Sequence, residues 1–532
     1  MNLKLQLKIL SFLQFCLWGS WLTTLGSYMF VTLKFDGASI GAVYSSLGIA
    51  AVFMPALLGI VADKWLSAKW VYAICHTIGA ITLFMAAQVT TPEAMFLVIL
   101  INSFAYMPTL GLINTISYYR LQNAGMDIVT DFPPIRIWGT IGFIMAMWVV
   151  SLSGFELSHM QLYIGAALSA ILVLFTLTLP HIPVAKQQAN QSWTTLLGLD
   201  AFALFKNKRM AIFFIFSMLL GAELQITNMF GNTFLHSFDK DPMFASSFIV
   251  QHASIIMSIS QISETLFILT IPFFLSRYGI KNVMMISIVA WILRFALFAY
   301  GDPTPFGTVL LVLSMIVYGC AFDFFNISGS VFVEKEVSPA IRASAQGMFL
   351  MMTNGFGCIL GGIVSGKVVE MYTQNGITDW QTVWLIFAGY SVVLAFAFMA
   401  MFKYNTFVSR QAHRRLATNY AKKNGSPEGD PFFLFLLQHI TVQPFHAIRI
   451  GFAINTLQLR RKSRQQIHPF FQCKEITLNR PTPDFPGYHA KHARWIRQRP
   501  FCRNSPFGIT NPHQLHFTAN ISAMRILGVH HH

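Results

Sequence analysis

Long apolar runs, each about as long as a membrane-spanning helix, recur through the first 403 positions of the chain. A helix needs about 20 mostly apolar residues to cross a hydrocarbon core of about 30 Å. Twelve such runs can be read, separated by polar and turn-forming residues: 5–31, 38–62, 70–89, 94–118, 134–153, 161–180, 209–234, 247–271, 281–300, 306–329, 343–369 and 380–402. The pattern therefore predicts an all-α membrane protein with twelve transmembrane helices.

The longest connection between these runs divides them into two groups of six. It covers residues 181–208 and is polar. We expect residues 1–180 and 209–403 to form two six-helix halves joined by a cytoplasmic linker. A division of this kind is typical of transport proteins built from repeats, which bind substrate near the middle of the membrane between the halves.

The composition agrees with a membrane protein. The 532 residues are 54% hydrophobic and 11% charged, whereas about 25% of the residues in soluble domains are charged. Too few charges are present to cover a surface of this size in water. The composition thus excludes an ordinary soluble enzyme.

The positive charge is concentrated in the last part of the chain. Of the net charge of +16, residues 404–532 carry +14, because 18 Lys and Arg stand there against 4 Asp and Glu. This tail has no apolar run long enough to span a membrane, and we expect it to be disordered or the product of a frameshift or read-through. A regulatory domain in the cytoplasm is the alternative. Nucleic-acid binding would depend on the tail alone, so we expect no nucleic-acid partner.

Lys and Arg also predict the orientation. With the N-terminus in the cytoplasm, 14 of the Lys and Arg in the loops of residues 1–403 lie inside, and only Lys34, Lys240 and Lys367 lie outside. This is the bias of membrane proteins toward positive cytoplasmic loops. Both termini are then cytoplasmic.

Cysteines and glycines suggest no metal or nucleotide chemistry. The six cysteines show no CxxC or Cys/His ligand spacing, so neither a zinc site nor a disulfide framework is predicted. The segment 361–367 imitates a phosphate-binding loop but lies inside an apolar run and lacks the following Ser or Thr. Close packing of helices through small residues explains it better.

Four ionisable residues were identified inside the predicted spans: Arg136, Glu264, Arg294 and Asp323. Such residues are costly in a membrane and are functional candidates. Arg294 has only apolar neighbours at helical spacing, so we expect it to snorkel or to pair structurally, outside the site.

Polar and aromatic residues stand beside the other three at helical spacing. One helix face each is predicted for the sets Arg136, Thr140 and Phe143; Gln225 and Asn228; Gln261 and Glu264; Tyr318, Phe322 and Asp323. Hydrogen bonding between helices is the alternative for such amides, and for Asn114, Asn326 and Asn354 we favour it. Four helices that each present two or three such groups indicate a shared polar cavity.

The chemistry of this cavity suits a neutral nucleoside. Carboxylates and amides bind hydroxyls and the edges of nucleobases, and Phe143, Tyr318 and Phe322 offer faces on which a base can stack. One arginine beside two acids disfavours a phosphorylated substrate. A disaccharide remains an alternative.

Four segments carry a resemblance to a known superfamily and to one family within it. The loop from Gly59 to Asp63 and Lys64 resembles the G-x-x-x-D-[RK] signature of the major facilitator superfamily, in which Asp63 could latch two helix ends. The segments 132–140 and 318–325, together with residues 1–4, resemble the nucleoside:proton symporter family of that superfamily. The resemblance covers residues 1–403 and stops at the tail.

The resemblance implies import of purine and pyrimidine nucleosides, such as uridine and adenosine, with protons, by alternating access. It implies a monomer in the lipid bilayer of the bacterial inner membrane, driven by the proton gradient without a cofactor. It also implies a substrate site formed by Arg136, Thr140, Phe143, Gln225, Asn228, Gln261, Glu264, Tyr318, Phe322 and Asp323.

Proton coupling needs a group that gains and loses a proton while it faces the cavity. Glu264 and Asp323 are the candidates, and we favour Asp323. Two other functional classes remain as alternatives. A membrane enzyme would need a catalytic motif, and none is present in the sequence. A sensor with a transporter-like body would bind nucleoside without accumulating it.

Overall fold

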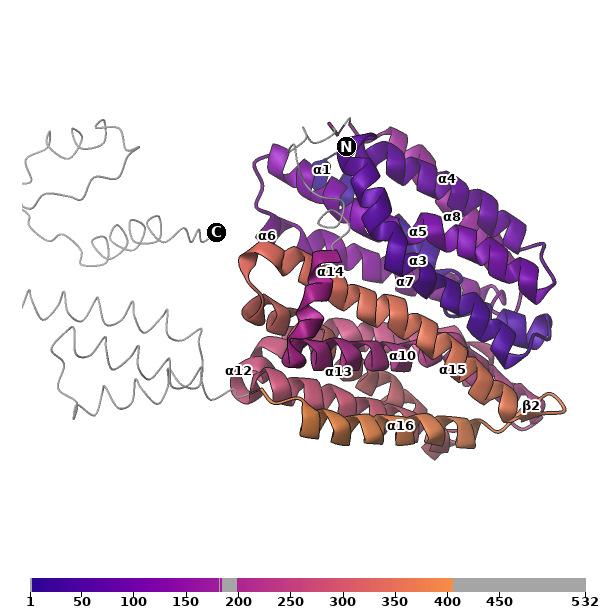
Figure 1. Cartoon of the computed structure of the whole chain (residues 1–532). Coiled ribbons are helices and arrows are strands. Elements are labelled where there is room, and N and C mark those ends of the chain that lie inside the picture. Colours follow the sequence, from indigo (N-terminus) through magenta and orange to yellow (C-terminus); the bar gives the residue numbers. More distant parts are fainter. Residues whose placement is uncertain (1, 181, 184–198, 405–532) are drawn as a thin grey trace, which may run out of the picture. The chain divides into compact units, whose positions relative to one another are not determined.

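The computed structural model describes residues 2–180, 182–183 and 199–404 (Figure 1). The predicted tail from residue 405 onward and most of the predicted linker lie outside these residues.

The described residues are almost entirely helical. The first part contains α1 (Leu3–Gly19), α2 (Leu25–Ser27), the π-helix η1 (Tyr28–Thr32), α3 (Gly37–Lys64), α4 (Ala68–Ala86), α5 (Pro92–Asn123), α6 (Ile128–Asp131), α7 (Pro133–Leu152) and α8 (Met160–Leu177). The second part contains η2 (Leu199–Lys206), α10 (Lys208–His236), η3 (Ser237–Lys240), α11 (Phe248–Gln251), α12 (Ala253–Tyr300), α13 (Pro305–Glu336), η4 (Pro339–Ile341), α14 (Arg342–Leu350), the π-helix η5 (Met351–Phe356), α15 (Gly357–Met371) and α16 (Trp380–Met401).

Local sequence explains where these elements begin and turn. Prolines stand at the first positions of α5, α7 and α13. Proline has no backbone N–H, and the first N–H groups of a helix have no partner within the helix, so proline costs nothing there. Asp36 caps α3, because its carboxylate accepts a hydrogen bond from the Ser39 amide at 2.6 Å. The connection between the last two predicted runs contains a hairpin of β1 (Thr373–Gln374) and β2 (Ile377–Thr378). Asn375 and Gly376 form its turn with positive φ angles of 52° and 74°.

Ten helices among the described residues are long and apolar enough to cross a membrane. Two features of the structure account for the difference between these ten helices and the twelve predicted runs. The first run is interrupted after α1, where residues 20–24 form turns before α2 and η1. The eighth and ninth runs both lie in α12, whose 48 residues contain two helices that meet at a kink at the non-helical Gly279, with φ 77°.

The helices form two groups (Figure 1). Within residues 3–179, which we call the N-terminal half, α1 packs on α7, α4 on α8 and α3 on α5. Within residues 199–404, the C-terminal half, α12 packs on α13 and α16, and α10 packs on α15. The halves meet where α3 packs on α15, α7 on α12 and α2 on α10.

Glycines line the contact between α3 and α15. A Cβ atom on Gly41 would lie 2.2 Å from the backbone oxygen of Gly362, and one on Gly37 would lie 2.5 Å from that of Gly366. Only glycine lets two backbones approach this closely. The prediction that small residues in 361–367 serve helix packing is confirmed.

The contacts between the halves are concentrated toward one end of the bundle. We call it the Glu156 end, because the turn 153–159 between α7 and α8 lies there; the other end carries the start of α1. The hydrogen bonds that join described residues of the two halves, such as Trp148 Nε1 to Ser258 Oγ at 2.8 Å and Ser45 Oγ to the Ile359 carbonyl at 3.3 Å, lie on the Glu156 side. Among the described residues, no ion pair joins the halves at the opposite end.

Candidate functional site

The predicted site residues of the N-terminal half lie on one helix that packs tightly on α1. A Cβ atom on Gly19 would lie 2.4 Å from the Phe143 carbonyl oxygen, and one on Gly142 would lie 2.3 Å from that of Phe12. This close approach fixes α7 on α1. The Arg136 guanidinium then lies 4.0 Å from the centre of the Phe15 ring, a cation–π contact.

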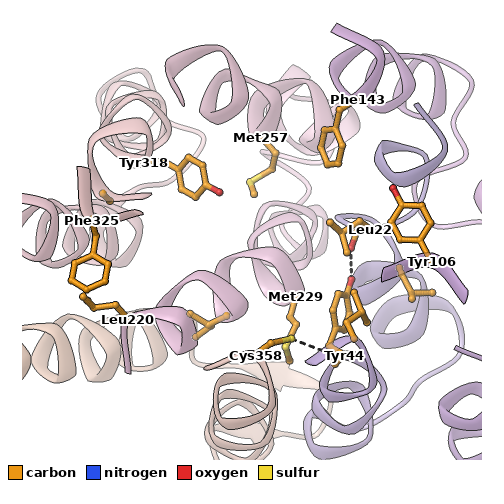
Figure 2. Close-up of a cluster of buried hydrophobic side chains, with 14 of the residues drawn as sticks. Leu22, Tyr44, Tyr106, Phe143, Leu220, Met229, Met257, Tyr318, Phe325 and Cys358 are labelled. Atoms are coloured by element: carbon orange, nitrogen blue, oxygen red, sulfur yellow. Dashed lines mark hydrogen bonds between the residues drawn. The ribbon is translucent and has the colours of Figure 1, made fainter. Parts of the chain in front are cut away.

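Aromatic side chains surround Phe143 on this side. Its ring meets the Trp18 ring edge to face at 6.3 Å, and Trp18 in turn lies 5.4 Å from Tyr106. In Figure 2 the Tyr318 hydroxyl of α13 points toward Met257 of α12 and Phe143 of α7. Phe143 and Tyr318 thus present aromatic groups from the two halves toward the same region.

The two predicted acids and Arg136 lie near enough to one another to interact electrostatically. Glycine at position 319 allows this, because a Cβ there would lie 2.7 Å from the Glu264 backbone nitrogen. Helix α13 can therefore approach α12 backbone to backbone. Glu264 interacts electrostatically with both Arg136 and Asp323. Asp323 is 4% exposed, and its Oδ2 has no hydrogen-bond partner among the described residues.

Tyr318 and Phe322 form a stacked pair on α13, with ring centres 5.9 Å apart and planes at 7°. Arg294 lies behind Tyr318, with its guanidinium 4.6 Å from the ring centre. It is fully buried and donates a hydrogen bond to the Ser314 carbonyl at 2.8 Å. Of the two expectations for Arg294, structural pairing is confirmed and snorkelling is wrong.

Two of the predicted amides, Gln225 and Asn228, do not join helices. Gln225 is 6% exposed, and its Nε2 has no hydrogen-bond partner among the described residues. Thr140 and Asn228 are half-buried, and no described residue hydrogen-bonds their side chains. Gln261 of α12 differs from these two amides, because its side chain hydrogen-bonds Tyr318 of the neighbouring helix α13. Unpartnered amides favour a cavity that binds a ligand over hydrogen bonding between helices.

Asn326 also makes no hydrogen bond to another described helix, although sequence analysis favoured one. Its Nδ2 donates to the Phe322 carbonyl of its own helix at 3.2 Å. It lines, with Asn354, Phe322 and Trp291, a narrow crevice beside the predicted site.

The predicted latch at Gly59, Asp63 and Lys64 lies in the last turns of α3. Asp63 is exposed, and no ion pair joins it to another described residue. The nearby base Lys69 binds the carbonyl oxygens of Leu177, at 3.2 Å, and Leu179 at the end of α8. A latch at Asp63 stays a prediction.

Sequence analysis missed two ionisable groups in the spans, so the count of four was wrong. Glu223 of α10 is fully buried and accepts a hydrogen bond from Ser391 Oγ of α16 at 2.5 Å. His76 of α4 is 1% exposed and donates from Nε2 to Gln14 Oε1 at 2.9 Å. Both stand inside predicted spans, so the rule that drew attention to Glu264 applied to them too.

A third missed group lies at the Glu156 end. Glu156 precedes the sixth predicted span, yet it is 3% exposed and contacts the C-terminal half. A charged residue in a short loop is ordinarily exposed, so nothing in the sequence indicated that Glu156 is buried.

The described residues offer no metal site. No group of three or more His, Cys, Asp and Glu among them could hold a metal ion. Cys16, Cys75, Cys320 and Cys358 are free thiols. Transport without a cofactor stays a prediction.

Comparison with known proteins agrees with this arrangement. Residues 1–407 match the family described as Nucleoside H+ symporter. Xanthosine permease of Escherichia coli (strain K12) is 59% identical over 414 residues, which cover 78% of this chain and 99% of the permease. The putative nucleoside transporter YegT of the same strain is 30% identical over 417 residues, or 76% of this chain and 94% of the relative.

A solved structure shares the fold. The crystal structure of the peptide transporter POT in complex with sulfate matches with a TM-score of 0.58 at 13% identity, over 75% of this chain and 94% of POT. Family and relatives are transporters, so the chain is a membrane transport protein and not an enzyme. The chain belongs to the nucleoside H+ symporter family.

Proposed function

We propose that the chain imports purine and pyrimidine nucleosides, uridine and adenosine among them, together with protons by alternating access. One observation supports this most: in a chain of the nucleoside symporter family, buried Asp323 Oδ2 has no partner among the described residues and stands on the same helix as the stacked Tyr318–Phe322 pair. Gln225 Nε2 on α10 is likewise without such a partner. Buried polar groups without partners are costly. A ligand that completes their hydrogen bonds removes that cost.

The aromatic and the amide side chains of the site would bind different parts of the nucleoside. The base stacks on Phe143 from one half and on the Tyr318–Phe322 pair from the other. Gln225, Asn228 and Gln261 bind polar edges of the base and the ribose. Because each half supplies part of the site, a bound nucleoside favours their approach.

The charges suit a neutral substrate that travels with a proton. Arg136, Glu264 and Asp323 sum to one negative charge when both acids are ionised. A proton on Asp323 removes this excess and the repulsion between the two carboxylates. The neutral cavity can then close at lower cost, since a charge resists dehydration. Asp323 is thus the proposed coupling group, with Glu264 as its partner.

The same proposal places the chain in the bacterial inner membrane as a monomer with twelve spans. The α1–η1 segment counts as one span and α12 as two, divided at Gly279. The distribution of Lys and Arg places the start of α1 in the cytoplasm and the Glu156 end outside. The contacts between the halves then close the site toward the outside.

Uptake of labelled uridine by proteoliposomes tests the proposal. We expect accumulation when an inward proton gradient is imposed and its collapse when a protonophore is added. Uridine that binds without accumulating would identify a sensor. Competition by a disaccharide but not by unlabelled adenosine would support the sugar alternative. Unchanged accumulation in the presence of the protonophore would exclude symport.

A further inference from the structure

Glu156 of the N-terminal half accepts most of its hydrogen bonds from the C-terminal half, although Ser151 of its own half also contributes one. Its Oε2 accepts hydrogen bonds from Asn232 Nδ2 at 2.9 Å and from His236 Nε2 at 2.9 Å, both on α10. Both carboxylate oxygens lie 3.2 Å from the backbone nitrogen of Ser254, in the first turn of α12. The carboxylate therefore caps a helix of the other half, where the helix dipole favours a negative charge.

A second layer of contacts holds both sides of this cluster in place. Asn232 Oδ1 accepts a hydrogen bond from Ser27 Oγ at 2.5 Å. On the loop itself, Gln161 Nε2 donates to the Glu156 carbonyl at 3.0 Å, and Thr24 Oγ1 donates to Gln161 Oε1 at 2.5 Å. Each of these side chains is buried. The cluster is built from both halves and excludes water.

The electrostatic surroundings favour the ionised form of Glu156. Burial alone would raise the pKa of its carboxyl, but the hydrogen bond and charge of His236, together with the hydrogen bonds of Asn232 and Ser151, lower it below the ordinary value. No other titratable side chain of the neighbouring described elements hydrogen-bonds Glu156 directly. His252 contacts Ser151 Oγ at 3.1 Å, and Asp239 and Lys240 of η3 are exposed.

The donors lie on the same helices as the predicted substrate site. Asn232 stands one turn beyond Asn228 on α10. Gln261 and Glu264 lie eight and eleven residues after the start of α12, which is about 12 and 16 Å along a helix axis. A movement that frees Glu156 must shift these rigid helices relative to α7 and α8. The cluster and the site therefore move together.

We propose that Glu156 is a gating residue: its docking between α10 and α12 closes the substrate cavity at the Glu156 end, and its release opens that end. The inference rests on the proposed transport function for its role in the cycle. Asn232, His236 and Ser254 act through Glu156 and are positioning residues. The hydrogen bonds of Glu156 to Asn232, His236 and Ser254 all cross between the halves, so they can persist only while the halves stay together at this end.

Spin labels at the Glu156 end test this without substrate. Lys34→Cys and Ser246→Cys are exposed positions on the two halves, and the distance between labels on them is measured by pulsed electron resonance in lipid nanodiscs. Glu156→Gln keeps the size but removes the charge and turns an N–H donor toward other donors. We expect the population with a longer distance to rise about tenfold or more, the factor that 1.4 kcal/mol represents.

Glu223→Gln is the matched control. It makes the same substitution at a buried carboxyl of α10 whose partner, Ser391, lies in the same half, so the distance distribution should stay that of the parent. Asn232→Ala removes one donor and should shift the distribution the same way by less, which keeps the test informative if Glu156→Gln does not fold.

Two outcomes separate this inference from the proposed function. An unchanged distribution in both Glu156→Gln and Asn232→Ala, in a protein that accumulates uridine, overturns the gate alone. A shifted distribution in a protein whose parent form accumulates no nucleoside leaves the gate in place and overturns the proposed function.

Discussion

The glycine contact between α3 and α15 makes a quantitative prediction about how the halves close. In Gly41→Ala the new Cβ would lie 2.2 Å from the Gly362 backbone oxygen, and no side chain there can rotate away. An ordinary contact needs about 3.4 Å, so the two helices must separate by about 1 Å. Overpacking of this kind costs about 1–3 kcal/mol.

This cost falls on the conformation in which the halves touch at the Glu156 end. If the α3–α15 contact opens in the transport cycle, the closed population should fall by a factor of about 5 to 150, since 1.4 kcal/mol is tenfold. The spin-label pair at positions 34 and 246 measures this as a longer distance. Thermal unfolding should also occur at a lower temperature than in the parent.

The matched control is Gly389→Ala on α16, where a new Cβ has nothing within 4 Å. We expect it to leave the distance unchanged and to stabilise the helix slightly. If Gly41→Ala and Gly389→Ala give the same distances and the same unfolding temperature, the backbone contact does not hold the halves together and the reasoning is wrong.

Four other predictions concern the site, the gate and the tail. Asp323→Asn keeps size and hydrogen bonding but cannot titrate, so nucleoside counterflow should persist while uphill accumulation is lost; uphill accumulation with the parent's dependence on external pH would transfer the coupling role to Glu264. Gln225→Ala should raise the Kd for uridine about tenfold while the protein without ligand keeps its unfolding temperature; a destabilised variant with normal affinity would indicate helix packing instead. Because the pKa of Glu156 lies below its ordinary 4.5 in the folded protein, its carboxylate stabilises the fold above that pH and loses this effect as the pH falls further, so the unfolding-temperature difference between parent and Glu156→Gln should be constant from pH 6 to 5 and shrink below 4.5. A stop codon after Tyr404 should leave uptake intact, and loss of uptake in a well-expressed truncation would show that the tail is a functional domain.

The positions of the helices were predictable because membrane insertion depends on local composition. Each predicted run overlaps a helix of the structure, including the run 343–369, which α14, η5 and α15 share. An apolar segment of about 20 residues is more stable in lipid than in water wherever the rest of the chain lies. The break after α1 was not predictable in this way, because residues 20–24 stand inside an apolar run.

Part of the candidate site followed from sequence for a similar reason. Helical spacing alone places Arg136 with Phe143, and Tyr318 with Phe322, on shared faces. Spacing also drew attention to Glu264, but its position beside Asp323 depends on Gly319 and the approach of α13 to α12. Arg294 had no polar neighbour along its own helix, and its partner Ser314 lies on the next one.

The sequence by itself determined the class of protein, the spans and the kinds of polar group inside them, because these are properties of short segments and of composition. The tertiary structure alone decided which groups meet across the two halves. Glu156 is a loop carboxylate between two spans, and nothing within its own segment indicates burial. Its partners Asn232 and Ser254 lie 76 and 98 positions further along the chain. Hydrogen bonds over such separations form only after the helices have packed, so no local pattern records them.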